Sequence, residues 1–393
     1  MIDSFPKKTK HAALARPDSG EFGRHELAIL GAPCGVIQQL ARALARHLSP
    51  ALRVGYVDAE HAGPDQEPPF DEAPNLASGF AESAFSAELI DKISFRQLST
   101  RRVLDKFSQP ELLAHESLVL VNGNHFRARQ QVIILDPRKP LARKLDRLTD
   151  VQLILVTDAQ TELPDYLQVH LVASGRPLPP KRLLTDTAGI AAFVQGWYAA
   201  AVPPLRGLVL AGGLSQRMLT DKSRLFYHAQ EQRAHVAGLL GGLCQDVHIS
   251  GRPEQLADLP ENLSPLPDKF FGLGPVGGLL TAFQTDPNAA WLVVACDLPF
   301  LTADTLEFLV QHRQPGRLAT AFQSPDNEFP EPLITIWEPR GYATLLRFLS
   351  LGYSCPRKAL INSDIELLTA PRPAELRNIN TPEEAAEARA ELA

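Results

Sequence analysis

Cysteine is scarce in this chain, which has four cysteines among 393 residues: Cys34, Cys244, Cys296 and Cys355. They are widely separated, and no two of them form a Cys-x-x-Cys pair. This spacing argues against a zinc ribbon and against a disulfide-stapled scaffold, because both need paired cysteines. We therefore expect reduced thiols and a cytoplasmic protein.

Long apolar runs and basic stretches are also missing. No segment has the roughly 18 consecutive apolar residues that a membrane-spanning helix needs. The first 20 residues are basic and polar and lack the apolar core of a secretory signal. The net charge is −6 and the pI about 6.0, with no basic stripe. The composition predicts neither a membrane nor a nucleic acid as partner, so an anionic ligand must be attracted by local charges.

The order of apolar segments predicts the fold class. The length and the 45% hydrophobic content suggest two or three domains. Strand patterns alternate with helical patterns, which is typical of α/β proteins with doubly wound, mostly parallel sheets in three αβα layers. Pro-rich segments at 174–181 and 201–207 interrupt this alternation. We expect a flexible leader over residues 1–22, a first domain over 23–202 and a second over 203–393.

In the first half, residues 25–48 have the pattern of a strand, a glycine turn and an amphipathic helix. The later expected strands cover residues 52–61, 116–124, 131–136 and 151–158. The expected helices cover residues 87–94, 100–106, 140–148 and 187–201.

The glycine turn after the first strand has the position of a phosphate-binding P-loop. A working P-loop needs a lysine for the β- and γ-phosphates and a hydroxyl for Mg²⁺. Val36 and Ile37 stand in those places, and Gly31 is one residue too close. Because an aliphatic pair holds neither a triphosphate nor a metal, this domain is predicted to be a degenerate P-loop domain that has lost hydrolysis.

Several polar residues follow the strands of the first half. Asp58 and His61 could form a metal or base pair, or Asp58 could cap the next turn. Asn122, Asn124 and His125 could bind a ligand or bond to their own loop. Local capping and loop hydrogen bonding are the favoured interpretations.

Residues 208–222, LVLAGGLSQRMLTDK, form an apolar strand that leads into Gly212 and Gly213. Glycines let the backbone approach phosphate oxygens and aim several N–H groups at one anion. Arg217 and Lys222 supply positive charge where phosphate charge accumulates. The stretch predicts a nucleoside triphosphate site; the alternative is an ordinary strand-to-helix turn with surface basic residues.

Three later segments strengthen that prediction. Asp268 precedes a second glycine-rich turn that opens a helix within 266–282, and Asp297 follows a buried strand. Asn378 and Asn380 precede a Pro-led helix start. Ligands of open α/β sheets bind at the carboxyl ends of the strands, and an aspartate there can hold a metal that bridges phosphate oxygens.

Together these four segments resemble the molybdenum cofactor guanylyltransferases, members of the α/β nucleotidyltransferase superfamily, over roughly residues 205–393. LAGGLSQRMLTDK is similar to the family's LAGG-x-S-x-R-M-G-x-D-K, and GPVGG to its G-P-L-A-G. Residues 296–299 match C-D-x-P, and residues 378–384 match N-x-N-T-P-E-E. The resemblance implies a Rossmann-like fold and transfer of GMP from Mg²⁺-GTP to molybdopterin, with release of pyrophosphate. Cofactor-insertion proteins or molybdoenzymes are implied as further partners.

The resemblance also assigns roles to single residues. Catalysis falls to Arg217, Lys222 and Asp297, and Asp297 also holds Mg²⁺. The implied nucleotide-binding residues are Leu210, Ala211, Gly212, Gly213, Lys222, Asp268, Gly274 and Asp297. The second substrate falls to Asn378, Asn380 and Arg357. The alternatives are an Asn cap on the helix that begins at Thr381 and, for Arg357, a solvated helix face.

One departure from the family pattern keeps other functions open. Leu219 stands where the family has glycine, and its Cβ would block a phosphate contact or force a different turn. One alternative is a nucleotidyltransferase of the same fold with another base or acceptor. The other is a non-catalytic protein that binds or carries the pterin cofactor. The first half resembles the P-loop adaptor protein of molybdopterin guanine dinucleotide synthesis.

Overall fold

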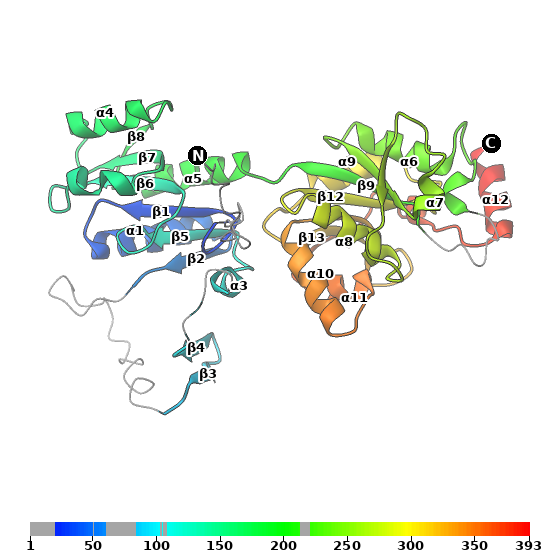
Figure 1. The fold of residues 1–393 in the computed structure, drawn as a ribbon, viewed down its shortest axis with the longest axis horizontal. Coiled ribbons are helices and arrows are strands. Elements are labelled where there is room, and N and C mark those ends of the chain that lie inside the picture. Colours follow the sequence, from blue (N-terminus) through cyan, green and yellow to red (C-terminus); the bar gives the residue numbers. More distant parts are fainter. Residues whose placement is uncertain (1–19, 50, 60–83, 103, 105–107, 213–220) are drawn as a thin grey trace, which may run out of the picture. The chain divides into compact units, whose positions relative to one another are not determined.

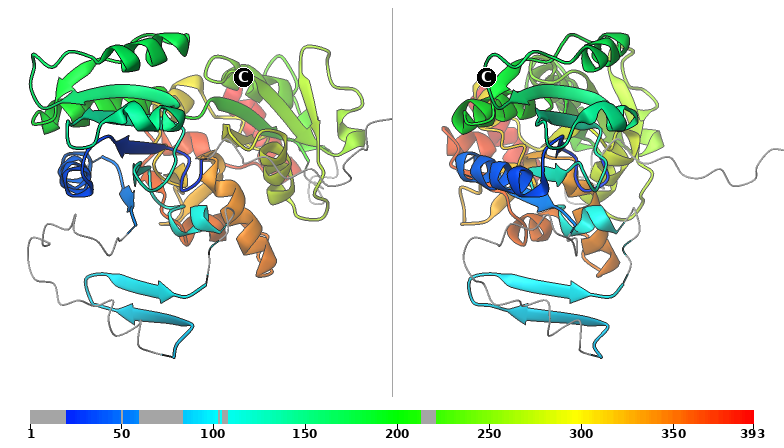
Figure 2. Two further views of the ribbon diagram at one scale, coloured as in Figure 1. Left: turned by 60° about the vertical axis from the view of Figure 1, so that its left-hand side comes forward. Right: turned by 90° about the vertical axis from the view of Figure 1, so that its left-hand side faces the viewer.

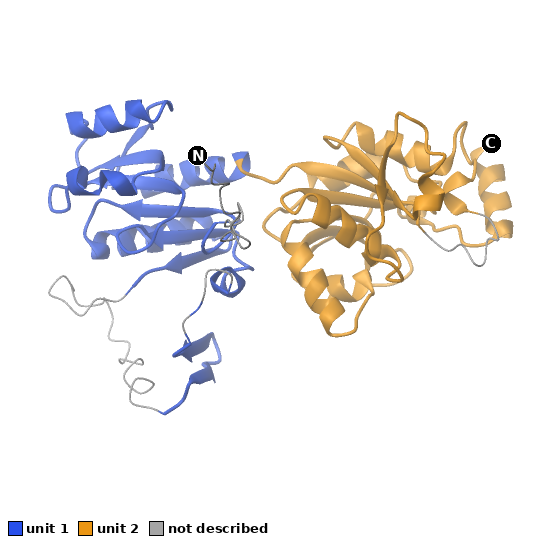
Figure 3. Ribbon diagram, in the orientation of Figure 1, with its two compact units in different colours: residues 1–200 blue, residues 201–393 orange. Residues whose placement is uncertain are grey.

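The structure is a computed structural model that describes residues 20–49, 51–59, 84–102, 104, 108–212 and 221–393. The chain divides into two compact units, residues 1–200 and 201–393 (Figure 3). Each unit has its own sheet and its own hydrophobic clusters, and the two are described separately.

The first unit is built on a six-stranded, fully parallel sheet with strand order β2-β5-β1-β6-β7-β8 (Figure 1). Its strands are β1 (Glu26–Leu30), β2 (Val54–Val57), β5 (Leu118–Asn122), β6 (Gln130–Leu135), β7 (Asp150–Val156) and β8 (Lys181–Leu183). Its helices are α1 (Cys34–Leu48), α3 (Gln109–Leu112), the 3₁₀ helix η1 (Leu141–Arg147), α4 (Asp165–Ala173) and α5 (Thr187–Ala200). The strand and helix predicted within residues 25–48 are confirmed, as are the strands predicted within 52–61, 116–124, 131–136 and 151–158, whereas β8 was not predicted.

Helices cover both faces of this sheet. Successive side chains of its central strands are buried and point to opposite faces, so both faces need a cover. Leu27 and Ile29 of β1 pack with residues of α1 and α5 on one face. Leu30 packs with residues of η1 and α4 on the other. Because neighbouring positions of a strand point to opposite faces, β1 is buried on both sides and the unit has three layers.

The helix predicted for residues 87–94 is wrong. The helix predicted for residues 100–106 lies partly outside the described residues, and the described residues 101, 102 and 104 are not helical. Strands β3 (Ala87–Asp91) and β4 (Arg96–Thr100) instead form an antiparallel hairpin that belongs to neither larger sheet (cyan in Figure 2). The side chain of Asp91 accepts a hydrogen bond from the backbone N–H of Ile93, which has a φ of 71°. This local turn reverses the chain where the apolar spacing alone fits a helix.

The second unit is built on a seven-stranded sheet with strand order β11-β10-β9-β12-β14-β13-β15. The strands are β9 (Leu205–Leu210), β10 (Val247–Gly251), β11 (Ser264–Pro267), β12 (Ala290–Ala295), β13 (Ala319–Gln323), β14 (Pro330–Trp337) and β15 (Glu366–Leu368). Neighbouring strands are parallel except that β14 runs antiparallel to both β12 and β13. The predicted α/β class with mostly parallel sheets is thus confirmed for both units.

Two hydrophobic clusters lie on opposite faces of this second sheet. Val209 of β9 packs with residues of α6 and α9, whereas Leu208 packs with residues of α8 and α10. Trp291 and Trp337 are fully buried in the second cluster. The helices of this unit are η2 (Lys222–Arg224), α6 (Gln232–Gly241), α7 (Pro253–Leu256), α8 (Pro275–Thr285), α9 (Ala303–Gln311), α10 (Arg340–Ser350), α11 (Pro356–Ile361), η3 (Pro373–Leu376) and α12 (Pro382–Leu392).

Within the described part of the chain, none of the helices combines the length and the apolar character needed to span a bilayer.

Candidate functional site

A cleft of about 700 Å³ opens in the second unit at the carboxyl ends of three neighbouring parallel strands. Leu210 ends β9, Ser250 lies near the end of β10, and Ala295 ends β12. All three residues line the cleft. Open α/β sheets bind their ligands at this edge, because loops and helix N-termini converge there. The fold therefore gathers the glycine turn and the two aspartates predicted from the sequence at one place.

Lys222 presents its ammonium group at one wall of this cleft. Its Nζ donates hydrogen bonds of 2.8 Å to the backbone carbonyl of Ile379 and to Oδ1 of Asn380. The same atom lies 3.6 Å from Oδ2 of Asp297. The late Asn segment thus orients the lysine, and the lysine in turn neutralises part of the aspartate's charge.

Asp297 lies two residues beyond β12, with its side chain largely buried. Burial raises the pKa of its carboxyl group, and the nearby Lys222 opposes that shift. Among the described residues, none donates a hydrogen bond to its buried Oδ1 atom. A buried carboxylate oxygen without a donor is costly, and a hard cation such as Mg²⁺, which prefers oxygen ligands, would satisfy it. The Asp297 oxygen is therefore of the kind that Mg²⁺ binds, although no group of three or more His, Cys, Asp or Glu side chains among the described residues forms a metal site around it.

Asp268 is a second carboxylate that lines this cleft. Its Oδ1 accepts a 2.5 Å hydrogen bond from the hydroxyl of Ser250. Burial raises the pKa of the Asp268 carboxyl group, while the Ser250 hydroxyl and Arg252 act in the opposite direction. A Cβ at Gly212 would lie only 3.0 Å from Oδ2 of Asp268. Gly212 therefore leaves room for the carboxylate to approach the backbone of the glycine turn.

The second glycine-rich turn lines the cleft with Gly272, Gly274, Pro275 and Gly278. Gly274 has a φ of 57° and precedes α8, which begins with Pro275. A Cβ on Gly277 would overlap the carbonyl oxygen of Phe270, and one on Gly278 would overlap the hydroxyl of Ser250. Glycine is needed at these positions because α8 packs directly against backbone and side-chain atoms of the cleft.

Gly277→Ala is expected to lower the free energy of unfolding of the second unit by about 1–3 kcal/mol, because backbone must move to admit the methyl group. Urea denaturation followed by tryptophan fluorescence measures it, since Trp291 and Trp337 are buried in this unit. Gly238→Ala is the control: Gly238 lies in α6 with no atom near its Cβ position. That change is expected to be neutral or slightly stabilising. Equal effects of the two changes would contradict the packing argument.

One residue beside the glycine turn, Gln255, was missed by sequence reasoning. Gln255 of α7 donates from Nε2 to the carbonyl of Ala211 (3.2 Å) and to Oδ2 of Asp221 (2.8 Å). Asp221 also caps η2 by accepting from the backbone N–H of Ser223. The aspartate next to Lys222 therefore anchors the loop that carries the lysine. Its position in the sequence could have indicated Gln255, because it is a polar residue shortly after the carboxyl end of β10.

The cleft brings together most of the predicted site residues. Those that line it are Leu210, Ala211, Gly212, Lys222, Asp268, Gly274, Asp297 and Asn380. Asn378 is exposed and does not line the cleft. Arg357 forms an ion pair with Glu331, at 3.0 Å, and donates to the carbonyl of Pro330. Gly213, Arg217 and Leu219 lie outside the described residues, as do His61 and residues 1–19 of the predicted leader.

The alternative of an Asn cap at the last helix is wrong. Thr381 caps α12: its hydroxyl oxygen accepts from the backbone N–H of Glu384, and Oε2 of Glu384 accepts from the backbone N–H of Asn380. These two bonds tie the first turn of α12 to Thr381 and to the main chain of Asn380, and they leave the Asn380 side chain available for Lys222.

The fold and the cleft define the second unit as an α/β domain with a binding site at the carboxyl edge of its sheet. The family model of the MobA-like NTP transferase domain matches residues 207–363. A molybdenum cofactor biosynthesis bifunctional protein of Synechocystis sp. is 36% identical over 182 residues, which are 46% of this chain and 52% of that protein. A probable molybdenum cofactor guanylyltransferase of Rhodopirellula baltica is 31% identical over 47% of this chain and 90% of that protein.

The chain therefore belongs to the MobA-like NTP transferases, a family of nucleotidyltransferase enzymes. It spans about half the length of the Synechocystis relative. Among solved structures, molybdopterin-guanine dinucleotide biosynthesis protein A of Archaeoglobus fulgidus aligns with 47% of this chain and 97% of its own. That pair has 20% identity and a TM-score of 0.41.

Proposed function

We propose that the second unit transfers GMP from GTP to the terminal phosphate of molybdopterin, with pyrophosphate as leaving group. The observation that supports this most strongly is the pairing of Lys222 with Asp297 in the cleft, 3.6 Å apart, with one carboxylate oxygen lacking a donor among the described residues. Such a pair is suited to a polyanion with a bound divalent cation, because the lysine can contact the polyanion and the carboxylate can contact the cation. Relatives named as molybdenum cofactor guanylyltransferases support the choice of base and acceptor.

The reaction joins two anions, so the chain's main task is positioning and charge neutralisation. The acceptor's phosphate oxygen attacks the α-phosphorus of GTP, and the bond to the bridging oxygen of pyrophosphate breaks. Lys222 donates to phosphate oxygens and stabilises their added charge. Gly212 lets backbone N–H groups approach the phosphates, and Asp268 accepts hydrogen bonds from the guanosine part. Bound at Asp297, Mg²⁺ would neutralise phosphate charge.

Three further assignments belong to this proposal. Asn380 is a positioning residue, because it holds the lysine ammonium at 2.8 Å. Arg217 and Gly213 would complete the phosphate contacts on the same turn. Asn378 and Arg357, which do not line the cleft, would contact the part of the pterin substrate that extends beyond it. The reaction would take place in the cytoplasm, where a molybdoenzyme or an insertion protein would receive the product.

Isothermal titration of the full chain with GTP and Mg²⁺ tests the proposal. We expect a single site with GTP binding at least about tenfold tighter than CTP or UTP, and clear weakening when EDTA removes the metal. Pyrophosphate release in the presence of molybdopterin then tests the transfer itself.

The three functions give different results in this titration. Equal binding of GTP and CTP would favour a transferase of the same fold with another base. Binding of molybdopterin without any nucleotide binding would favour a carrier of the pterin cofactor and overturn the proposal.

A further inference from the structure

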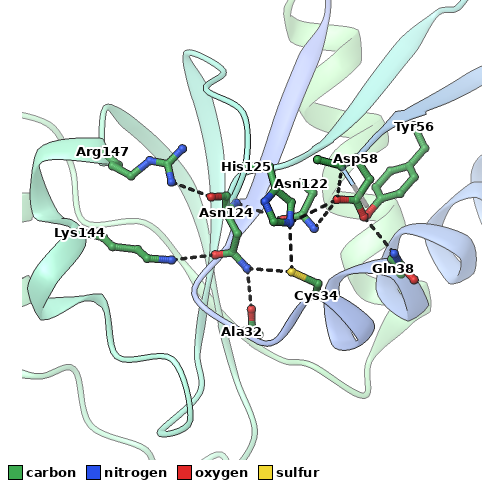
Figure 4. A network of polar contacts seen from close by, with 11 residues as sticks. Ala32, Cys34, Gln38, Tyr56, Asp58, Asn122, Asn124, His125, Lys144 and Arg147 are labelled. Carbon is green, nitrogen blue, oxygen red and sulfur yellow. Dashed lines mark hydrogen bonds and ion pairs between the residues drawn. The ribbon is translucent and has the colours of Figure 1, made fainter. Parts of the chain in front are cut away.

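A second group of reactive side chains lies in the first unit, at the carboxyl edge of its parallel sheet (Figure 4). Cys34 is the first residue of α1, directly after the turn that follows β1. Asp58 follows β2, and His125 follows β5. Because these strands are neighbours in the order β2-β5-β1, their carboxyl ends bring a thiol, a carboxylate and an imidazole together.

The distances show a nucleophile beside a proton acceptor. Sγ of Cys34 lies 3.2 Å from Nε2 of His125, and the same nitrogen lies 3.6 Å from Oδ1 of Asp58. The His125 and Asp58 side chains are only 10% and 15% exposed. An imidazole that takes the thiol proton at Nε2 becomes a cation, and the nearby carboxylate stabilises that cation.

Asp58 is held in place by contacts from other segments. Its Oδ2 accepts from Nε2 of Gln38 (3.1 Å) and from the hydroxyl of Tyr56 (2.7 Å). Its Oδ1 accepts from Nδ2 of Asn122 (2.8 Å). The favoured interpretation, local capping, accounts only for the bond from the backbone N–H of Ala59. The carboxylate is therefore fixed by Gln38 and Asn122 from other segments and by Tyr56 of β2, in addition to its own turn.

Two cationic side chains contact Asn124, which lies next to the thiol (Figure 4). Nδ2 of Asn124 lies 3.8 Å from Sγ of Cys34, and the Asn124 side-chain oxygen accepts from Nζ of Lys144 at 3.2 Å. Arg147 donates to the Asn124 carbonyl at 2.7 Å. Burial lowers the pKa of Lys144, and the like charges of Arg147 and Lys139 lower it further. An anion bound here would relieve that repulsion.

The start of α1 adds to this preference for an anion. The helix has 15 residues, no acidic residue in its first turn and no side-chain cap at Pro33. The partial positive charge of such a terminus favours an anionic ligand near Cys34.

We propose that Cys34 is a nucleophilic thiol that undergoes exchange with small anionic disulfides, with His125 as the proton acceptor. The Cys34 proton passes to Nε2 of His125, and the thiolate attacks one sulfur of the disulfide. A mixed disulfide forms on Cys34 as the incoming S–S bond breaks. The other half leaves as a thiolate, which takes up the proton. The incoming disulfide is the oxidant: Cys34 is oxidised to the mixed disulfide, and the departing half of the reagent is reduced to a thiol.

The other three cysteines provide internal references for this reaction. Burial raises the pKa of Cys244 to about 12 and also raises the pKa of the buried Cys296. Cys355 is exposed. Accessibility alone therefore predicts that Cys355 reacts fastest, whereas the proposal predicts Cys34.

The test treats the full chain with oxidised glutathione and follows each cysteine by peptide mass spectrometry after acid quenching. We expect Cys34 to form its mixed disulfide at least about tenfold faster than Cys355, and His125→Gln to slow Cys34 about tenfold or more while leaving Cys355 unchanged. A Cys34 rate at or below that of Cys355, or an unchanged rate in His125→Gln, would overturn the proposal.

The choice of an anionic disulfide is tested separately with Lys144→Gln. This change is expected to slow the reaction with oxidised glutathione and to leave the reaction with the neutral bis(2-hydroxyethyl) disulfide unchanged. Equal effects on both reagents would overturn the anion preference. Loss of far-UV circular dichroism, together with a change in the emission of Trp197, which packs against the core of the first unit, would reveal unfolding of a variant. If His125→Gln unfolds, Asp58→Asn replaces it, with the same slowing of Cys34 expected.

Discussion

Replacing Asp297 by Asn is expected to lower kcat/KM for pyrophosphate release from GTP and molybdopterin by about 10³-fold or more. Asn keeps the shape of the side chain but loses the negative charge that would hold Mg²⁺ beside the phosphates. The loss follows from the position of the carboxylate, whose buried Oδ1 has no donor among the described residues. Steady-state pyrophosphate release measures the activity, and titration with Mg²⁺-GTP measures binding.

The same change separates activity from stability. Burial raises the pKa of Asp297 in the folded protein, so its ionised form destabilises the fold at neutral pH. The neutral amide of the variant has no such cost, and the variant should therefore unfold at the same temperature or higher. Asp304→Asn, at a carboxylate that is 71% exposed, is the control and should keep full activity. Activity lost in both variants, or lost together with the fold, would contradict the assigned role.

Replacing Lys222 by Met is expected to lower kcat/KM by about 10²–10³-fold, because the ammonium that faces the phosphates is removed. Lys222→Arg keeps the charge but cannot reproduce both 2.8 Å contacts to Ile379 and Asn380, so it should recover only part of the activity. Lys269→Met removes an exposed lysine of the same unit and should be neutral.

Asn380→Ala tests the positioning of the lysine within the same experiment. Its loss should be smaller than that of Lys222→Met, and the double variant should be no worse than Lys222→Met alone. Additive losses would mean that Asn380 acts independently of Lys222.

The sequence was sufficient to predict elements whose apolar pattern is buried on both sides. β1, α1 and the strands of the second sheet around Leu210 and Ala295 followed from runs of apolar residues and glycine turns. The hairpin at residues 87–100 was not predictable in this way. Leu89 and Ile93 have helical spacing, and the outcome depended on a single Asp91 turn. A short amphipathic run carries too few positions to separate period two from period 3.6.

For the candidate site, sequence motifs predicted the residues but not their partners. Lys222 and Asp297 are 75 positions apart, and a shared binding edge follows from the rule on carboxyl ends of strands. The ion pair of Arg357 with Glu331 and the bond of Gln255 to Asp221 depend on tertiary packing between segments that no motif links. For that reason sequence reasoning predicted neither the ion pair of Arg357 nor the contacts of Gln255.

The contacts of Ile379 have a practical consequence for mutagenesis. Its carbonyl accepts from Lys222, and its N–H donates to the carbonyl of Asp297, so both links to the site are made by main-chain atoms. Its side chain packs with Tyr227 and Ala385. An alanine scan would consequently report only the loss of packing and overlook the peptide group. An amide-to-ester replacement at this position, made by chemical ligation, would remove the N–H donor alone and expose its contribution to turnover.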